Sequence, residues 1–68
     1  MAYSNLVAEM ARKKITIRKI AATMKKSVSK ISKNINGSGG DFNIEEAFFI
    51  RDTFFPECEI EYLFRREK

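Results

Sequence analysis

The sequence has few of the residues from which catalytic and metal sites are usually built. Among its 68 residues there is no histidine, no tryptophan and a single cysteine, Cys58. One cysteine cannot form a disulfide within the chain, and without histidine it cannot supply the ligands of a zinc site. A serine or cysteine nucleophile paired with histidine is excluded for the same reason. We therefore expect no metal centre.

Motifs for nucleotide binding and membrane insertion are missing as well. The three glycines, Gly37, Gly39 and Gly40, lie in one short segment and form neither GxxxxGK[ST] nor GxGxxG. The longest apolar run, residues 47–50, is far shorter than the roughly 18 residues of a membrane span. No basic region followed by an apolar block opens the chain, so we expect no signal peptide. These absences predict a cytoplasmic protein that is not an enzyme and binds no cofactor and no membrane.

Charge is distributed unevenly along the chain. Residues 1–40 contain nine basic side chains and one acid, a net charge of +8, whereas residues 41–68 contain four basic and eight acidic side chains, a net charge of −4. Scattered lysines often form only a solvated face. Cations this dense repel one another, however, and a polyanion relieves that repulsion. Double-stranded DNA is the expected partner, whereas a membrane is disfavoured because the segment lacks a broad aromatic face.

Apolar residues recur at helical spacing, and no segment alternates with a period of two over a useful length. The pattern predicts one compact all-α domain over residues 1–68, since a chain this short has room for no second domain. Five short helices are expected, at residues 5–13, 17–24, 28–35, 43–55 and 59–64.

Capping residues support these boundaries. Ser4, Thr16 and Ser27 are expected N-caps, and Asn43 with Glu46 forms the pattern of a capping box. Gly37 and Pro56 are expected to end the third and fourth helices. The sets expected to face the core, apolar except for Arg51, are Leu6, Val7, Met10 and Ala11; Ile17, Ile20, Ala21 and Met24; Val28, Ile31 and Ile35; Ile44, Ala47, Phe48, Arg51, Phe54 and Phe55; and Ile60, Leu63 and Phe64.

Residues 16–37 fit a helix-turn-helix, in which two helices meet steeply across a very short turn so that the second can enter the major groove. Such a motif needs a small residue where the helices approach, and Ala21 supplies it. It needs apolar residues that fix each helix to the core, and a cap at the exposed start of the second helix. Ile20, Met24, Ile31 and Ser27 meet these needs.

The same segment resembles the Cro/repressor-type (XRE-like) helix-turn-helix regulators of phages. Positions that match the usual family pattern are Thr16, Ile20, Ala21, Met24, Ser27, Ile31, Ser32, Asn36 and Gly37. The tail, residues 44–64, resembles the last two helices of small prophage regulators from Gram-positive bacteria. The resemblance implies a five-helix lambda-repressor-like domain, DNA binding, and a homodimer on paired half-sites.

Carried onto this chain, the resemblance implies a DNA-binding surface on the second and third helices. Val28 is open to a second interpretation as a core residue, and Ser27 to one as a cap alone. Residues expected to face the groove or its flanks are Ser27, Val28, Ser29, Lys30, Ser32, Lys33 and Asn34. Residues expected on the DNA backbone side are Thr16, Arg18, Lys19, Lys25 and Lys26.

A second hypothesis keeps the fold and changes the partner. Ile17 stands where the family often has glutamine, Lys25 where the turn usually has glycine, and Lys26 where an apolar residue is usual. Phe49 lies off the expected core stripe, and with Tyr62 it is a candidate for a protein interface, although it could also belong to a wider core. The alternative is therefore an antirepressor that binds a phage repressor protein.

Overall fold

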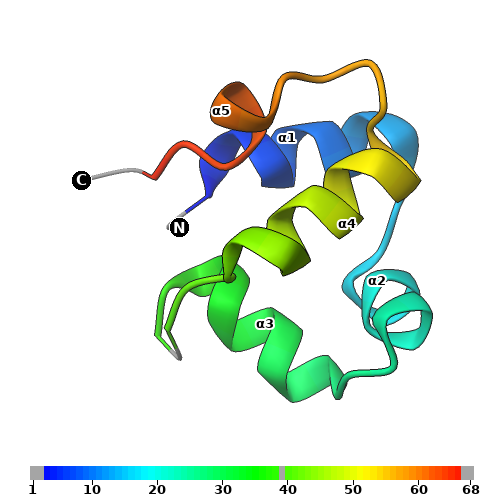
Figure 1. Cartoon of the computed structure of the whole chain (residues 1–68). Helices are drawn as coiled ribbons and strands as arrows, with labels where there is room; N and C mark the ends of the chain where they lie inside the picture. Colours follow the sequence, from blue (N-terminus) through cyan, green and yellow to red (C-terminus); the bar gives the residue numbers. More distant parts are fainter. Residues whose placement is uncertain (1–2, 39, 67–68) are drawn as a thin grey trace.

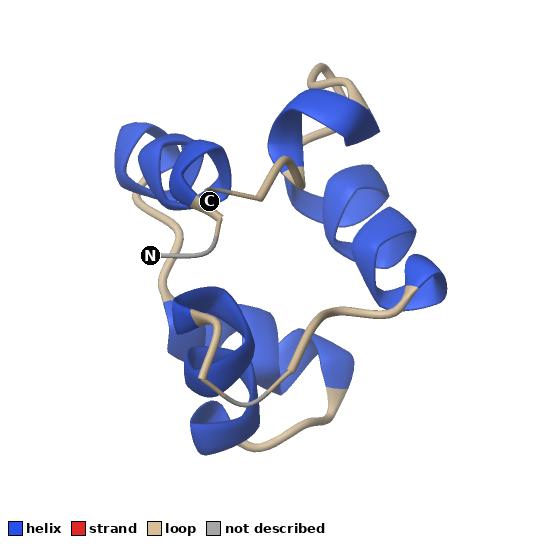
Figure 2. Ribbon diagram, turned by 90° about the vertical axis from the view of Figure 1, so that its left-hand side faces the viewer, coloured by secondary structure: helices blue, strands red, loops and turns tan. Residues whose placement is uncertain are grey.

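Five helices joined by short connections make up the part of the chain that the computed structural model describes, residues 3–38 and 40–66 (Figure 1). Figure 2 shows helices and loops with no strand among these residues. The all-α prediction is confirmed, and the molecule measures 27 × 26 × 22 Å. No helix in the described ranges is long and apolar enough to cross a membrane. The helices are α1 (Ser4–Lys13), α2 (Ile17–Met24), α3 (Val28–Asn36), α4 (Ile44–Phe54) and α5 (Ile60–Leu63).

Three of the expected N-caps are confirmed. The Thr16 hydroxyl accepts a hydrogen bond from the Lys19 amide, and the Ser27 hydroxyl accepts one from the Lys30 amide. At α4 both bonds of the capping box are present: Asn43 Oδ1 accepts from the Glu46 amide, and Glu46 Oε1 accepts from the Asn43 amide. These side chains satisfy amides that the start of a helix leaves unpaired.

The cap predicted at the first helix is wrong. Ser4 is the first residue of α1, and Tyr3 occupies the N-cap position without a side-chain cap hydrogen bond. The Tyr3 ring is instead buried against Phe42 and Phe64, with centroid distances of 5.5 and 5.7 Å. This aromatic cluster packs the start of α1 against the C-terminal end of the described chain.

Helices α1, α2 and α3 end in the same way. Each is followed by a residue with positive φ: Lys14 at 60°, Lys25 at 59° and Gly37 at 81°. The next amide along the chain then bonds back to a carbonyl five residues earlier, as in Ile15 N to Met10 O and Lys26 N to Ala21 O. This Schellman geometry reverses the chain sharply after each helix.

The core draws on side chains from all five helices. Its central side chains come from α1 (Leu6, Met10), α2 (Ile20, Ala21), α3 (Ile31, Ile35), α4 (Ile50, Phe54), the residue after α4 (Phe55) and α5 (Leu63). Val7, Ile17, Met24 and Phe64 are only partly buried against it, and Ala11 is exposed.

The stripe predicted for the fourth helix is wrong in part. Ile50, which the prediction left out, is fully buried, whereas Ile44 is 72% exposed and Phe48 is also exposed. The buried positions Ala47, Ile50 and Phe54 follow a 3-4 spacing, which defines one face of a helix. Apolar residues occupy several faces of α4, and tertiary packing selected this one.

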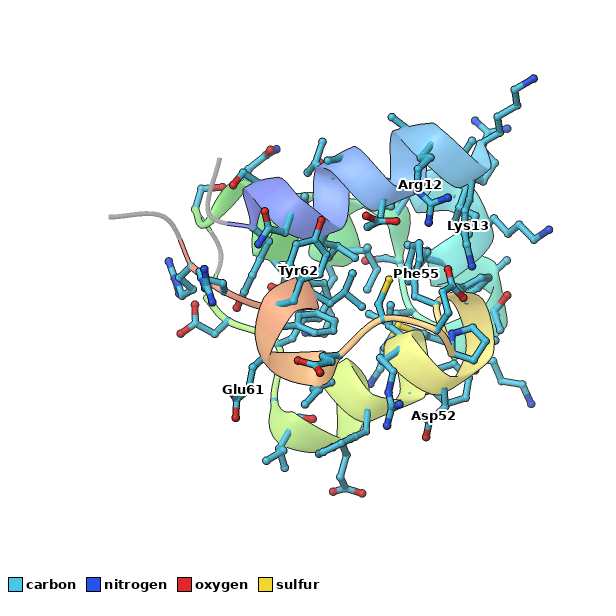
Figure 3. The ribbon with its side chains drawn as sticks, turned by 90° about the horizontal axis from the view of Figure 1, so that it is seen from above. Arg12, Lys13, Asp52, Phe55, Glu61 and Tyr62 are labelled. Atoms are coloured by element: carbon cyan, nitrogen blue, oxygen red, sulfur yellow. The ribbon has the colours of Figure 1, made fainter. Side chains whose placement is uncertain are left out.

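A polar network ties α1 to the segment that follows α4. Glu9 accepts hydrogen bonds from Arg12 and from the Tyr62 hydroxyl, at 2.6 and 3.0 Å. Lys13 Nζ lies 2.5 Å from a Glu57 carboxylate oxygen and donates to the Phe54 carbonyl. Figure 3 shows Arg12, Lys13 and Phe55 gathered where α1 meets the end of α4. Two of the nine basic residues of the N-terminal half are thereby neutralised.

Candidate nucleic-acid interface

Helices α2 and α3 are joined by three residues, Lys25 to Ser27, and pack directly against each other. In Figure 1 α2 is seen nearly end-on while α3 runs across the view, so the two cross steeply. The approach is close because Ala21, 1% exposed, has no bulk beyond its Cβ. Ile20 and Ile31 are fully buried and anchor one helix each. This arrangement leaves the far side of α3 facing solvent.

The exposed face of α3 carries most of the predicted groove residues. Ser27, Ser29, Lys30 and Lys33 are exposed, and Ser32 is half-buried. Val28 is 47% exposed, which contradicts its alternative interpretation as a core residue. Ser27 combines exposure with its capping hydrogen bond.

Asn34 is the exception among the predicted groove and flank residues, because it is buried. The side chain is 2% exposed and lies between the buried positions Ile31 and Ile35. Its Nδ2 has no hydrogen-bond partner among the described residues. Asn34 lies three positions after Ile31 and one before Ile35, so the turn of the helix carries it inward with these core residues.

Polar side chains on α3 surround a hollow of about 280 Å³, lined by Ser27, Ser29, Lys30, Lys33 and Asn34. Lys30 at its edge also lies 3.8 Å from the Glu46 carboxylate of α4. This separation is at the outer limit of an ion pair, so the ammonium keeps most of its capacity for a further anion.

The predicted backbone-side residues are exposed and have no acidic partners among the described residues. Thr16, Arg18, Lys19, Lys25 and Lys26 are all exposed. Within residues 3–38 and 40–66, none of these four cations forms an ion pair, in contrast to Arg12 and Lys13. Lys14, which the sequence analysis left out, is equally exposed and unpaired in the described chain. The sequence feature that could have identified Lys14 is its position directly after the first helix and shortly before the N-cap Thr16.

Helix dipoles add to this uncompensated positive charge. The first turns of α2 and α3 contain no acid, and basic residues stand there instead: Arg18 and Lys19 on α2 and Lys30 on α3. A cation at the positive end of a helix dipole is unfavourable. An anion bound at the same place is attracted both by the dipole and by the cation. In contrast, α4 has Glu45 and Glu46 in its first turn. The interface therefore suits anions at α2 and α3 and not at α4.

No protein-family model, curated protein or solved structure matches this chain. The assignment of function therefore rests on the geometry and charge of the chain itself.

The two predicted protein-interface residues differ in their surroundings. Phe49 is 41% exposed, which contradicts a wider core that would enclose it. It lines a second hollow of about 320 Å³ between the end of α2 and the start of α4, together with Thr23, Met24, Lys25, Glu45 and Glu46. Tyr62 is partly exposed, but its hydroxyl is already engaged by Glu9. Of the two, only Phe49 presents an unengaged surface.

A cluster of possible metal ligands lies where α1 meets the segment that follows α4. Among the described residues Glu9, Glu57 and Cys58 place ligand atoms within 4.8 Å of one another. Both carboxylates are held by cations, and the hydrogen bonds from Arg12 and Lys13 lower the pKa of Glu9 and Glu57 respectively. Burial raises the pKa of the Cys58 thiol, which disfavours the thiolate that a metal requires. The cluster is best explained as part of the α1 network.

Proposed function

We propose that the chain is a sequence-specific DNA-binding transcriptional regulator of the phage Cro-like or repressor-like type. It docks α3 in the major groove of an operator. The observation that carries the proposal is the exposed face of α3, together with exposed cations of α2 and of the α2–α3 turn, Arg18, Lys19 and Lys26, that no acid of the described chain neutralises. It acts in the cytoplasm of a bacterial host, where the operator is.

Side chains on α3 have the chemistry to distinguish base pairs. Lys33 can donate to O6 and N7 of guanine, and Val28 can contact the methyl group of thymine. Ser29 can bond to a base edge or to a phosphate. Arg18, Lys19 and Lys26 fix the position of the helix through phosphates, which carry no sequence information.

Titration of operator-region DNA with the protein, followed by fluorescence anisotropy, tests this proposal. We expect specific binding at low salt. With six or more phosphates neutralised by two bound copies, affinity should fall about 10³-fold between 50 and 200 mM salt. Lys33→Ala should weaken discrimination at one base pair by about 1–3 kcal/mol, whereas Lys19→Ala should weaken binding to all sequences alike.

Arg65→Ala is the matched control, because this exposed cation follows α5 and lies outside the α2–α3 surface. It should leave affinity and sequence preference unchanged. Absence of a specific complex at low salt would contradict the proposal. An equal loss of DNA affinity for Arg65→Ala and Lys19→Ala would show that binding depends on general positive charge and not on the α2–α3 surface.

A second candidate function is favoured by Phe49. An exposed aromatic side chain beside a hollow is typical of protein interfaces, so the chain could act as an antirepressor that captures a phage repressor. Calorimetric titration with a repressor encoded beside it tests this candidate. Heat of binding that Phe49→Ser abolishes would support it, and no binding would reject it.

A further inference from the structure

The hollow beside Phe49 has walls of opposite charge. Lys25, after the last turn of α2, lies on one wall, and Glu45 and Glu46 of the first turn of α4 lie on the other. Among the described residues neither Lys25 nor Glu45 forms an ion pair, although both line the same hollow. Lys25 and Glu45 therefore do not neutralise each other in the structure and remain open to a partner.

Apolar side chains lie between and beside these charges. Met24 is half-buried and Phe49 is 41% exposed, and both line the hollow. Ile44, one residue before Glu45, is among the most exposed large apolar residues described. An apolar centre with charges at its edge is the usual composition of a protein interface.

We infer that this surface, defined as Met24, Lys25, Ile44, Glu45 and Phe49, binds a second copy of the same chain. Two copies related by a two-fold axis through the hollow place Lys25 of each opposite Glu45 of the other, because such an interface is its own complement. DNA is disfavoured as the occupant, since both glutamates would repel its phosphates. A partner of one charge would match one wall and be repelled by the other.

This inference deepens the proposed function, since it names the surface through which two copies would pair on an operator. It also assigns Lys25 to the contact between protomers and leaves the recognition side chains Ser29 and Lys33 free, since neither lines this hollow. Self-association is measured without DNA, so it can fail while DNA binding holds, and the reverse.

Charge reversal, followed by sedimentation equilibrium, tests the pairing. Lys25→Glu alone places like charges at both contacts of the dimer, and so does Glu45→Lys alone. Each should raise the dissociation constant of the dimer about tenfold or more. An equimolar mixture of the two variants should associate at least as tightly as the unmodified chain, because both contacts of the mixed dimer are then attractive.

Matched controls exist for both substitutions. Lys14→Glu changes the same residue type in the same positive-φ position after a helix, and Glu61→Lys changes a glutamate in the first turn of α5. Neither residue lines the hollow, so neither variant, nor their mixture, should change self-association. Circular dichroism melting of each variant shows whether it is folded.

Phe49→Ser provides a second variant independent of charge, and it should also weaken the dimer about tenfold or more. The inference is overturned if the unmodified chain stays monomeric up to millimolar concentration. It is also overturned if folded Lys25→Glu and Glu45→Lys associate as before, or if their mixture remains monomeric. A complex that forms only with a different protein would assign the surface to that partner instead.

Discussion

Two lysines, Lys14 and Lys25, occupy backbone positions that glycine adopts more easily. Their φ values of 60° and 59° lie in the left-handed region, where a Cβ costs roughly 1–2 kcal/mol. Lysine at the end of a helix gains favourable interaction with the dipole, which offsets part of that cost. Both side chains are exposed, so core packing does not explain them. A lysine at such a site is consistent with a role toward a partner.

Replacing Lys14 with glycine should therefore stabilise the fold. The strain of the left-handed residue disappears, while glycine raises the entropy of the unfolded chain, so the free energy of unfolding should rise by about 0.5–1 kcal/mol. Urea denaturation measures the change. Lys26→Gly is the control, because Lys26 has no positive φ and should lose stability instead. Equal effects at the two positions would contradict the strain at Lys14.

At the scale of the helix, local signals predicted boundaries better than faces. Thr16, Ser27, Gly37 and the Asn43–Glu46 box act within four residues of themselves, so the sequence suffices to place them. The buried face of a helix depends on what packs against it. Along α3 this left the direction of the Asn34 side chain undecided. Along α4, four consecutive apolar residues defined no single buried face. The correct face of α4 emerges only with α5 and the core in place.

The corrected face of α4 can be tested with one substitution at two positions of the same helix. Ile50→Val removes a methylene group from a fully buried side chain and should lower the free energy of unfolding by about 1 kcal/mol. Ile44→Val removes the same group from a side chain that is mostly exposed and should change stability by less than about 0.5 kcal/mol. Urea denaturation measures both. A larger loss of stability for Ile44→Val than for Ile50→Val would instead support the buried face predicted from the sequence.

For the molecule as a whole, the division of charge along the chain becomes a division in space. Glu9, Glu57 and Tyr62 neutralise cations or engage one another where α1 meets the C-terminal segment. Tyr62 is 53 residues from Glu9 and Glu57 is 45 residues from Arg12 along the chain, so no local pattern could have paired them. Residues 41–68 contain eight acidic side chains, but the sequence alone did not show which cations they would pair with. Which cations stay free for DNA became clear only from the fold.

The network at α1 makes stability depend on pH in a predictable direction. Hydrogen bonds from Arg12 and Tyr62 lower the pKa of Glu9 in the folded chain. A carboxyl whose pKa is depressed by folding contributes stability at neutral pH and loses it as the pH falls through the folded pKa, below about pH 4. Glu9→Gln should therefore unfold at lower urea concentration than the unmodified chain at pH 7, and the difference should be smaller at pH 3. Glu61→Gln, at an exposed position outside the network, should show no such convergence. If the gap for Glu9→Gln were the same at both pH values, Glu9 would act through packing rather than through its charge.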